Sequence, residues 1–293
     1  MGSDPDYTGA GTRPGACIIG GTMEHSAGGA MRARAGRALL GAQAAMGGLA
    51  ALAALSLMVL PSCASAQASL EAAPLPAPFS GAKPGTTMPV GWEPVKLTER
   101  KKPTVYTLVD DNGTVVLHAR AVAAASGLAQ LTVFDVRSAP IVEWRWKVSA
   151  LIDAADNRVA AKEDAPARLL FAFDGDKSRL PLVERAIFYV TEKLSGRELP
   201  YALLQYVWAT ALPVGTVIDH PYTRRVRMIV AASGKDGVGA WQTHARNVHD
   251  DYRLAFGEEP GPLIGVGVLT DTDNTGASVD AWYGDIRFVP ANR

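Results

Sequence analysis

The chain is poor in cysteine and carries no net charge. Cys17 and Cys63 are the only cysteines among its 293 residues, which excludes the disulfide scaffold of small secreted domains. Lys and Arg together number 29, as do Asp and Glu, so the chain as a whole has no basic field and no nucleic-acid partner is expected. Apolar residues make up 48% and charged residues 20%, a balance typical of a chain with a sizeable packed core.

The sequence also lacks an apolar run long enough for a comfortable membrane span, which takes about 20 residues. The uncharged run from Leu49 to Leu60 follows a basic stretch and precedes an A-x-A cleavage site at residues 64–66. This order is typical of a secretory signal peptide. We therefore predict a signal peptide over residues 31–66 and an exported mature protein, periplasmic or secreted, without a transmembrane helix. Residues 1–30 show no structural pattern and are expected to precede the true start.

Cys63 allows a second outcome of processing. Residues 60–63 have the form of a lipobox, in which the cysteine is lipidated and anchors the protein to a membrane. Pro61 is a poor residue inside that motif, so cleavage after Ala66 is the favoured prediction and lipid anchoring at Cys63 is the alternative. After cleavage the mature chain contains no cysteine, which excludes thiol chemistry.

The segment that follows the signal is predicted to be a linker. Residues 67–91 are rich in proline, with little else but alanine, glycine, serine and threonine, a composition typical of a semi-rigid tether. No repeat and no second linker follow it. Residues 92–293 are therefore predicted to form a single domain.

Most of this domain has the pattern of β-strands. Residues 104–110 and 114–120 flank Asp111-Asn112-Gly113, a strong hairpin signal because Asn-Gly accepts positive φ readily. Residues 143–148 alternate strictly, with both tryptophans and the valine on one face and the charged residues on the other. Further strands are predicted at residues 168–174, 224–232, 263–269 and 281–289.

Two helices are predicted among the strands. Residues 181–194 place apolar side chains at helical spacing after Pro181, which suits a first turn. Residues 249–256 form a shorter helix that Gly257 would close at the C′ position. The predicted fold is mainly β, a jelly-roll-like β-sandwich with two short helices. The alternative is an α+β fold whose antiparallel sheet is covered on one face by helices.

Several clusters of residues are distinctive. They are residues 144–146, 164–169, 206–208, 246–253, 256–257, 269–276 and 281–286. In these clusters and in their order the chain resembles the domain-of-unknown-function family numbered 3047, a group of exported bacterial proteins. The resemblance covers most of the chain from residue 144 to residue 288. The family has no established activity, so the resemblance implies neither a reaction nor a ligand.

Residues 271–276 (Asp-Thr-Asp-Asn-Thr-Gly) suggest a calcium loop, because alternating oxygen side chains and a glycine turn suit a hard cation. Asp271, Asp273 and Thr275 are the candidate ligands. Trp282 stands where an EF-hand loop has its bidentate carboxylate, so the match is partial. The alternative, and the favoured interpretation, is a turn whose side chains bond its own backbone. No cofactor is otherwise expected.

Residues 246–253 gather arginine, histidine and aspartate within two turns of chain. Asp250 or Asp251 suits a general base beside His249. The favoured interpretation is a helix start, in which His249 or Asp250 caps the helix and Arg246 pairs with a buried acid such as Asp164 or Asp174. Histidine spacing does not suggest a zinc site, and no G-x-S-x-G motif supports a nucleophile-elbow hydrolase.

Tryptophan is the last functional signal. Aromatic side chains on β-sandwiches stack on sugar rings, but they also fill cores. Strict alternation favours a core position for Trp144 and Trp146. For Trp208 and Trp282 the sequence does not decide between a core position and a ligand-facing one. We predict a protein of the cell envelope that binds a ligand, most plausibly a glycan. The alternatives are a polysaccharide hydrolase or lyase using Asp250 with Asp271 or Asp273, and a structural envelope protein. The predicted ligand-binding residues are Arg168, Asp174, Trp208, Arg246, Asp250, Asp251, Asp271 and Asp273.

Overall fold

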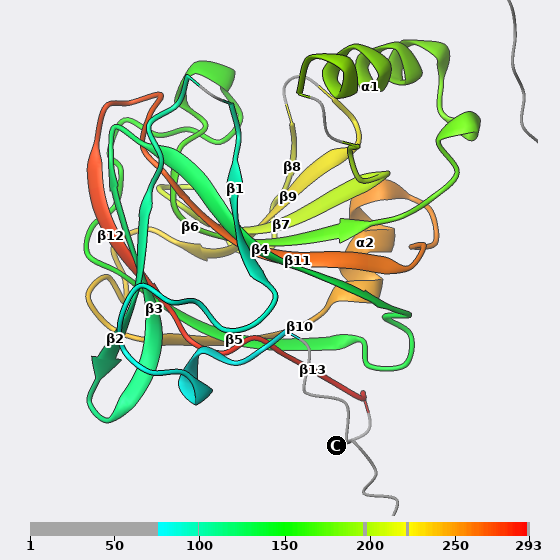
Figure 1. Cartoon of the computed structure of the whole chain (residues 1–293). Helices are drawn as coiled ribbons and strands as arrows, with labels where there is room; N and C mark the ends of the chain where they lie inside the picture. The colour runs from blue at the N-terminus through cyan, green and yellow to red at the C-terminus, as the bar shows by residue number, and fades with distance from the viewer. Residues whose placement is uncertain (1–75, 99, 196–197, 221–222, 292–293) are drawn as a thin grey trace, which may run out of the picture. The chain divides into compact units, whose positions relative to one another are not determined.

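The computed structural model describes residues 76–291, except for residues 99, 196–197 and 221–222. The predicted signal peptide, both cysteines and the first part of the predicted linker lie outside the described residues. No helix in the described part of the chain is long and apolar enough to cross a membrane. Two β-sheets and two α-helices make up the fold (Figure 1).

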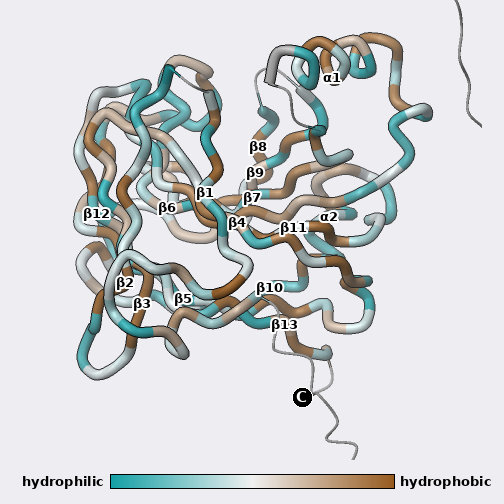
Figure 2. Tube along the Cα trace, in the orientation of Figure 1, coloured by the Kyte–Doolittle hydropathy of each residue, from teal (hydrophilic) through white to brown (hydrophobic). Residues whose placement is uncertain are grey.

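One sheet has seven strands in the order β1-β4-β11-β6-β7-β9-β8. Its strands pair antiparallel except β7 with β9, which run parallel. Figure 2 shows hydrophobic residues concentrated along β7, β9 and β11 in this sheet. The bounds are β1 Trp92–Lys96, β4 Ala125–Phe134, β6 Ala165–Phe173, β7 Ala202–Ala209, β8 Val217–Asp219, β9 Val226–Ser233 and β11 Leu263–Asp271.

The other sheet has six strands, with β10-β5-β12-β3-β2 in order and β13 also paired with β5. Its predicted hairpin is confirmed, since Asn112 and Gly113 have φ of 57° and 81° between β2 and β3. This double positive φ matches the strand twist, which is why Asn-Gly serves here. The bounds are β2 Val105–Asp111, β3 Thr114–Val122, β5 Ile141–Val148, β10 Gln242–Asn247, β12 Ser278–Tyr283 and β13 Arg287–Val289.

The two sheets bury their facing sides against each other, so the predicted mainly β sandwich is confirmed. Trp144 and Trp146 of β5 point into the core, as their alternation predicts. Trp144 stacks on Tyr206 of β7, with ring centroids 5.0 Å apart. The six-stranded sheet covers the inner face of the seven-stranded sheet. Because this face is not covered by helices, the α+β alternative does not apply.

The two helices are confirmed and play different parts. Helix α2 (Val248–Phe256) is capped by Asn247, whose side chain accepts the Asp250 N–H, and ends at Gly257 with φ of 71°. The predicted caps, His249 and Asp250, thus lie two and three residues after the observed one. Helix α1 (Leu182–Ser195) lies outside both sheets. Four of the apolar residues on which this helix was predicted, Leu182, Ala186, Tyr189 and Val190, are exposed rather than packed on the sandwich.

The predicted linker is partly folded. Phe79, in the 3-10 helix η1 (Phe79–Gly81), is buried against Trp92 with ring centroids 4.8 Å apart. Gln130 accepts the Ala77 N–H, and the Ala77 carbonyl accepts the Trp92 indole N–H. Residues 76–91 therefore pack on the sandwich instead of forming a tether, because two aromatic rings anchor this proline-rich segment.

Candidate functional site

Arg168 and Asp271 form a buried ion pair between neighbouring strands β6 and β11. The guanidinium donates from Nε to Oδ1 over 3.1 Å and from Nη2 to Oδ2 over 3.2 Å, and the side chains are only 3% and 7% exposed. Burial raises the pKa of Asp271 to about 6, although Arg168 acts to lower it. The charged groups of these two predicted ligand-binding residues thus satisfy each other inside the sandwich, and contact of either with a ligand stays a prediction.

Arg246 and Asp251 form a second pair. Arg246 donates from Nε and Nη2 to the two Asp251 oxygens, each over 2.6 Å, and the Tyr206 hydroxyl donates to Oδ2 over 2.6 Å. The predicted partners of Arg246, Asp164 and Asp174, are therefore wrong. Asp251 lies nearer, in the first turn of α2, and the pair ties this helix to the sandwich.

The loop at residues 271–276 is held by residues from elsewhere in the chain. Asp164 accepts the Thr275 N–H over 2.7 Å and its hydroxyl over 2.6 Å. Asp273 pairs with Lys101 over 2.8 Å. A distant carboxylate thus holds the loop backbone, in place of the loop's own side chains. Calcium binding by Asp271, Asp273 and Thr275 stays a prediction.

The remaining predicted residues lie apart from one another. Trp208 is fully buried and its indole N–H donates to the Gly234 carbonyl, so it offers no surface to a ligand. Asp174 is exposed just after β6, and Asp250 is exposed on α2. None of the predicted ligand-binding residues lines the pocket described next. They form one buried pair, one part-buried pair, a core tryptophan and separate carboxylates rather than one concavity.

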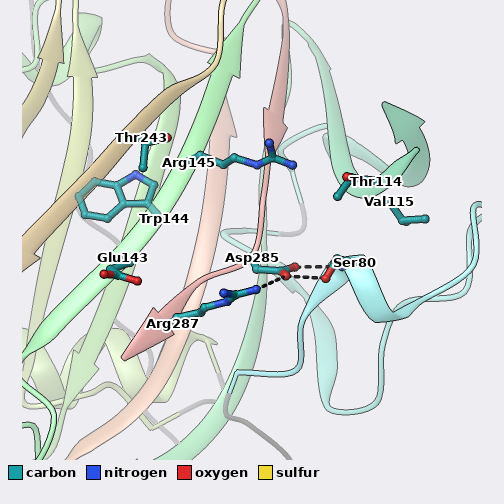
Figure 3. A pocket seen from close by; sticks show the side chains of 9 residues that line it. All are labelled: Ser80, Thr114, Val115, Glu143, Trp144, Arg145, Thr243, Asp285 and Arg287. Atoms are coloured by element: carbon teal, nitrogen blue, oxygen red, sulfur yellow. Dashed lines mark hydrogen bonds and ion pairs between the residues drawn. The ribbon is translucent and has the colours of Figure 1, made fainter. Parts of the chain in front are cut away.

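A pocket of about 290 Å³ opens between η1 and the outer face of the six-stranded sheet (Figure 3). Because residues alternate along β5, Glu143 and Arg145 face outward into it while the tryptophans fill the core. β3, β10 and β13 supply other walls. The lining residues are Ser80, Thr114, Val115, Glu143, Trp144, Arg145, Thr243, Asp285 and Arg287.

One wall of the pocket is fixed by polar contacts. Asp285 accepts the Ser80 backbone N–H over 2.9 Å and its hydroxyl over 2.5 Å. Arg287 lies 3.5 Å from the same carboxylate. Figure 3 shows Ser80 reaching Asp285 from η1. The segment predicted as a linker therefore builds part of this pocket.

The other polar side chains of the pocket have unused hydrogen-bonding capacity. Within the described part of the chain, no hydrogen bond or ion pair engages the side chains of Glu143, Arg145, Thr114 or Thr243. The four together offer a carboxylate, a guanidinium and two hydroxyls. All four are at least partly exposed to solvent, so a ligand that enters the hollow can replace water as their hydrogen-bond partner.

An aromatic row borders the pocket on the same face. The Arg145 guanidinium lies 4.5 Å from the centre of the Trp241 ring, and Lys147 Nζ lies 5.1 Å from it. Asp111 accepts from Lys147 over 2.9 Å and from the Trp241 indole over 2.7 Å, and these hydrogen bonds lower the pKa of Asp111. Lys147 also lies 4.6 Å from the Trp282 ring.

Three unpartnered atoms lie in the aromatic cluster formed by Trp144, which lines the pocket, with Trp146 and His244. The indole N–H groups of Trp144 and Trp146 and Nε2 of His244 are buried, with no hydrogen-bond partner among the described residues. The His244 ring stacks on Trp144 with centroids 4.9 Å apart. Burial, with a further contribution from Arg246, lowers the pKa of His244 to about 4, so the ring is neutral at pH 7. Polar atoms in the core next to Trp144 thus also lack hydrogen-bond partners among the described residues.

Sequence reasoning did not find this pocket. The alternation of residues 143–148 placed Glu143 and Arg145 on the outward face of a strand, and this was the one signal in the sequence that pointed toward the pocket. Sequence reasoning had no means to bring Ser80 to Asp285, a contact that joins residues 205 positions apart.

The profile of a family described as "Protein of unknown function (DUF3047)" matches residues 90–287. No curated protein matches the sequence. Similar solved structures include a family 30 carbohydrate-binding module of a Clostridium thermocellum cellulosomal cellulase, 12% identical with a TM-score of 0.33, over 74% of this chain and 95% of that one. A β-1,2-glucanase from Parabacteroides distasonis is 13% identical with a TM-score of 0.30, over 69% and 23%. Cellulose induced protein Cip1 is 10% identical with a TM-score of 0.27, over 67% and 89%. These likenesses are too distant to assign a ligand.

Proposed function

We propose that this chain, which belongs to the DUF3047 family, binds a glycan in the pocket on the outer face of its six-stranded sheet. The observation that carries the proposal is a set of polar side chains in that pocket that make no hydrogen bond or ion pair with the described residues: Glu143, Arg145, Thr114 and Thr243. Sugar hydroxyls both donate and accept hydrogen bonds. A carboxylate that accepts, a guanidinium that donates and two hydroxyls that do both are therefore suited to them.

The size of the pocket suits a short stretch of glycan. Its volume of about 290 Å³ is just below the usual range for small-ligand sites, roughly 300–1,000 Å³. Arg145 connects the pocket to the aromatic row through its contact with Trp241. The half-exposed Trp241 therefore lies where the next sugar of a longer glycan would pass, and aromatic rings favour such contacts.

The hydrolase alternative has less support. It needs a carboxylate pair such as Asp250 with Asp271 or Asp273, with both groups open to substrate. Asp271 is buried against Arg168, and Asp273 pairs with Lys101. A purely structural role would make no use of the hydrogen-bonding groups in the pocket, whereas glycan binding would use all four.

The cellular location belongs to the same proposal. The signal sequence predicted at residues 31–66 places the mature protein in the periplasm or outside the cell, with lipid anchoring at Cys63 as the alternative. Both locations give the pocket access to envelope glycans.

A glycan array followed by titration calorimetry tests this function. We expect Glu143→Gln and Arg145→Met each to weaken binding of the selected glycan by about tenfold, since each removes a charge-assisted hydrogen bond. Glu93→Gln and Arg137→Met change exposed residues outside the pocket and serve as matched controls. Absence of any glycan ligand, or equal affinity in all four variants, would refute the proposal.

A further inference from the structure

Helix α1 is attached to the rest of the molecule by the side that carries Glu184 and Phe188. Glu184 is only 8% exposed. Its carboxylate accepts the Thr223 hydroxyl over 2.8 Å and the Arg224 backbone N–H over 3.1 Å. Phe188, one turn later, is also buried. These contacts set the rotation of the helix about its axis, and in Figure 1 the helix stands clear of both sheets.

The apolar side of α1 therefore faces outward. Its members recur at positions i, i+4, i+7 and i+8, one stripe of an α-helix. A water-soluble helix ordinarily buries such a stripe against its own core. The exposed fractions here are 78% for Leu182, 70% for Val183, 64% for Tyr189 and 52% for Val190, and Ala186 between them is exposed as well.

The charges on this exposed side are positive. Arg185 and Lys193 are exposed beside the apolar stripe, and the Lys193 ammonium lies 5.6 Å from the Tyr189 ring. The acids of the helix are occupied elsewhere. Glu184 is turned inward, and Glu192 accepts from Lys177 over 2.9 Å and from the Leu199 N–H. The outward surface is thus apolar with a basic border.

We propose that α1 docks on the surface of an anionic lipid bilayer. The helix lies in the plane of the interface, its apolar stripe enters the headgroup region, and Arg185 and Lys193 contact lipid phosphates. Tyr189 suits this depth, since its ring is apolar and its hydroxyl is polar. The 14 residues of α1 are too few to span a bilayer, which takes about 20.

A second copy of the chain fits this surface less well. A two-fold pairing of α1 with itself would place the Arg185 and Lys193 of one helix near those of the other. No exposed acid of the helix offsets that repulsion. A negatively charged lipid surface complements both the apolar stripe and its charges.

Flotation of the full chain with vesicles tests the proposal, together with hydrogen–deuterium exchange of α1. We expect binding to vesicles of phosphatidylglycerol and phosphatidylethanolamine, with slower exchange in α1, and neither effect with phosphatidylcholine alone. Protection within α1 separates this contact from any binding by the N-terminal segment.

Two variants and one control complete the experiment. Leu182→Asp/Val190→Asp and Arg185→Glu/Lys193→Glu should each reduce the protection of α1 by about tenfold. Leu254→Asp, which changes a residue 65% exposed on α2, should leave it unchanged. Unchanged protection in both variants, equal protection by neutral vesicles, or self-association through α1 without lipid binding would each overturn the proposal. Glycan binding is a separate readout, since none of these residues lines the pocket.

Discussion

Replacement of Arg168 by methionine should remove a large part of the stability of this domain. Arg168 engages Asp271 twice, donates to Gln205 Oε1 over 3.0 Å and also contacts the Glu163 carbonyl. The variant leaves a buried carboxylate that is only 7% exposed without its counter-charge. Loss of one partner of such a pair costs about 3–5 kcal/mol. For a domain of this size that is a fall in Tm of about 10 °C.

The pH dependence of this loss follows from the pKa of Asp271. With Arg168 present the folded pKa is about 6, above the ordinary value of 3.8. Loss of the guanidinium raises it further. A raised folded pKa means that the protonated acid favours folding, so its contribution is present below about pH 4 and is lost as pH rises through the folded pKa. The deficit of Arg168→Met should therefore be larger at pH 8 than at pH 5.

Urea unfolding at both pH values measures the effect, with Arg168→Met/Asp271→Asn as the coupled variant. The double variant removes the buried charge as well, so it should be more stable than Arg168→Met alone at pH 8. Arg137→Met, which breaks the exposed pair with Asp135, should leave the midpoint unchanged. A loss below about 1 kcal/mol for Arg168→Met, or a double variant no more stable than the single one, would show that the pair is not a coupled buried unit.

Two further predictions concern His244 and Gly261. The folded pKa of His244 is about 4, against 6.5 for the free side chain. The contribution of the neutral ring to stability is therefore complete above pH 6.5 and is lost as pH falls toward 4. Because the side chain is partly exposed, we expect this loss to lower the free energy of unfolding by about 2 kcal/mol. His244→Phe, compared with the parent by thermal unfolding at pH 7 and pH 4.5, should be less sensitive to acid, and an equal fall in Tm in both would contradict this origin. A Cβ on Gly261 would lie 2.2 Å from the Asp174 carbonyl oxygen, so Gly261→Ala should cost about 1–3 kcal/mol in urea unfolding. Gly215→Ala adds a Cβ in open space at φ of 87° and separates steric contact from backbone strain. A smaller loss at Gly261 than at Gly215 would refute the steric argument.

Local patterns in the sequence predicted most of the fold. The alternation around Trp144 placed β5 correctly, Asn112-Gly113 marked the hairpin, and Gly257 marked the end of α2. Each of these signals depends on residues within one turn or one strand, where side-chain direction and backbone φ are decided locally.

Contacts between distant residues were not predictable in this way. Arg168 and Asp271 lie on strands that are distant in sequence and become neighbours only when the sheet forms. The sequence therefore did not reveal the pair, and both residues were predicted to bind a ligand. The rotation of α1 depends on Glu184 meeting Thr223 and Arg224, and helical spacing does not reveal which side faces the core. Ser80 reaches the pocket because Phe79 is buried, although its surroundings have the composition of a linker.

The order of strands in the larger sheet affects how the molecule behaves at high concentration. One edge is β1, where Pro94 has no N–H to offer to another chain and Lys96 adds a charge. The opposite edge is β8, which has only 3 residues. An edge strand that is short or contains proline offers few free backbone groups with which a strand of a neighbouring molecule could pair. The larger sheet is thereby protected against edge-to-edge aggregation.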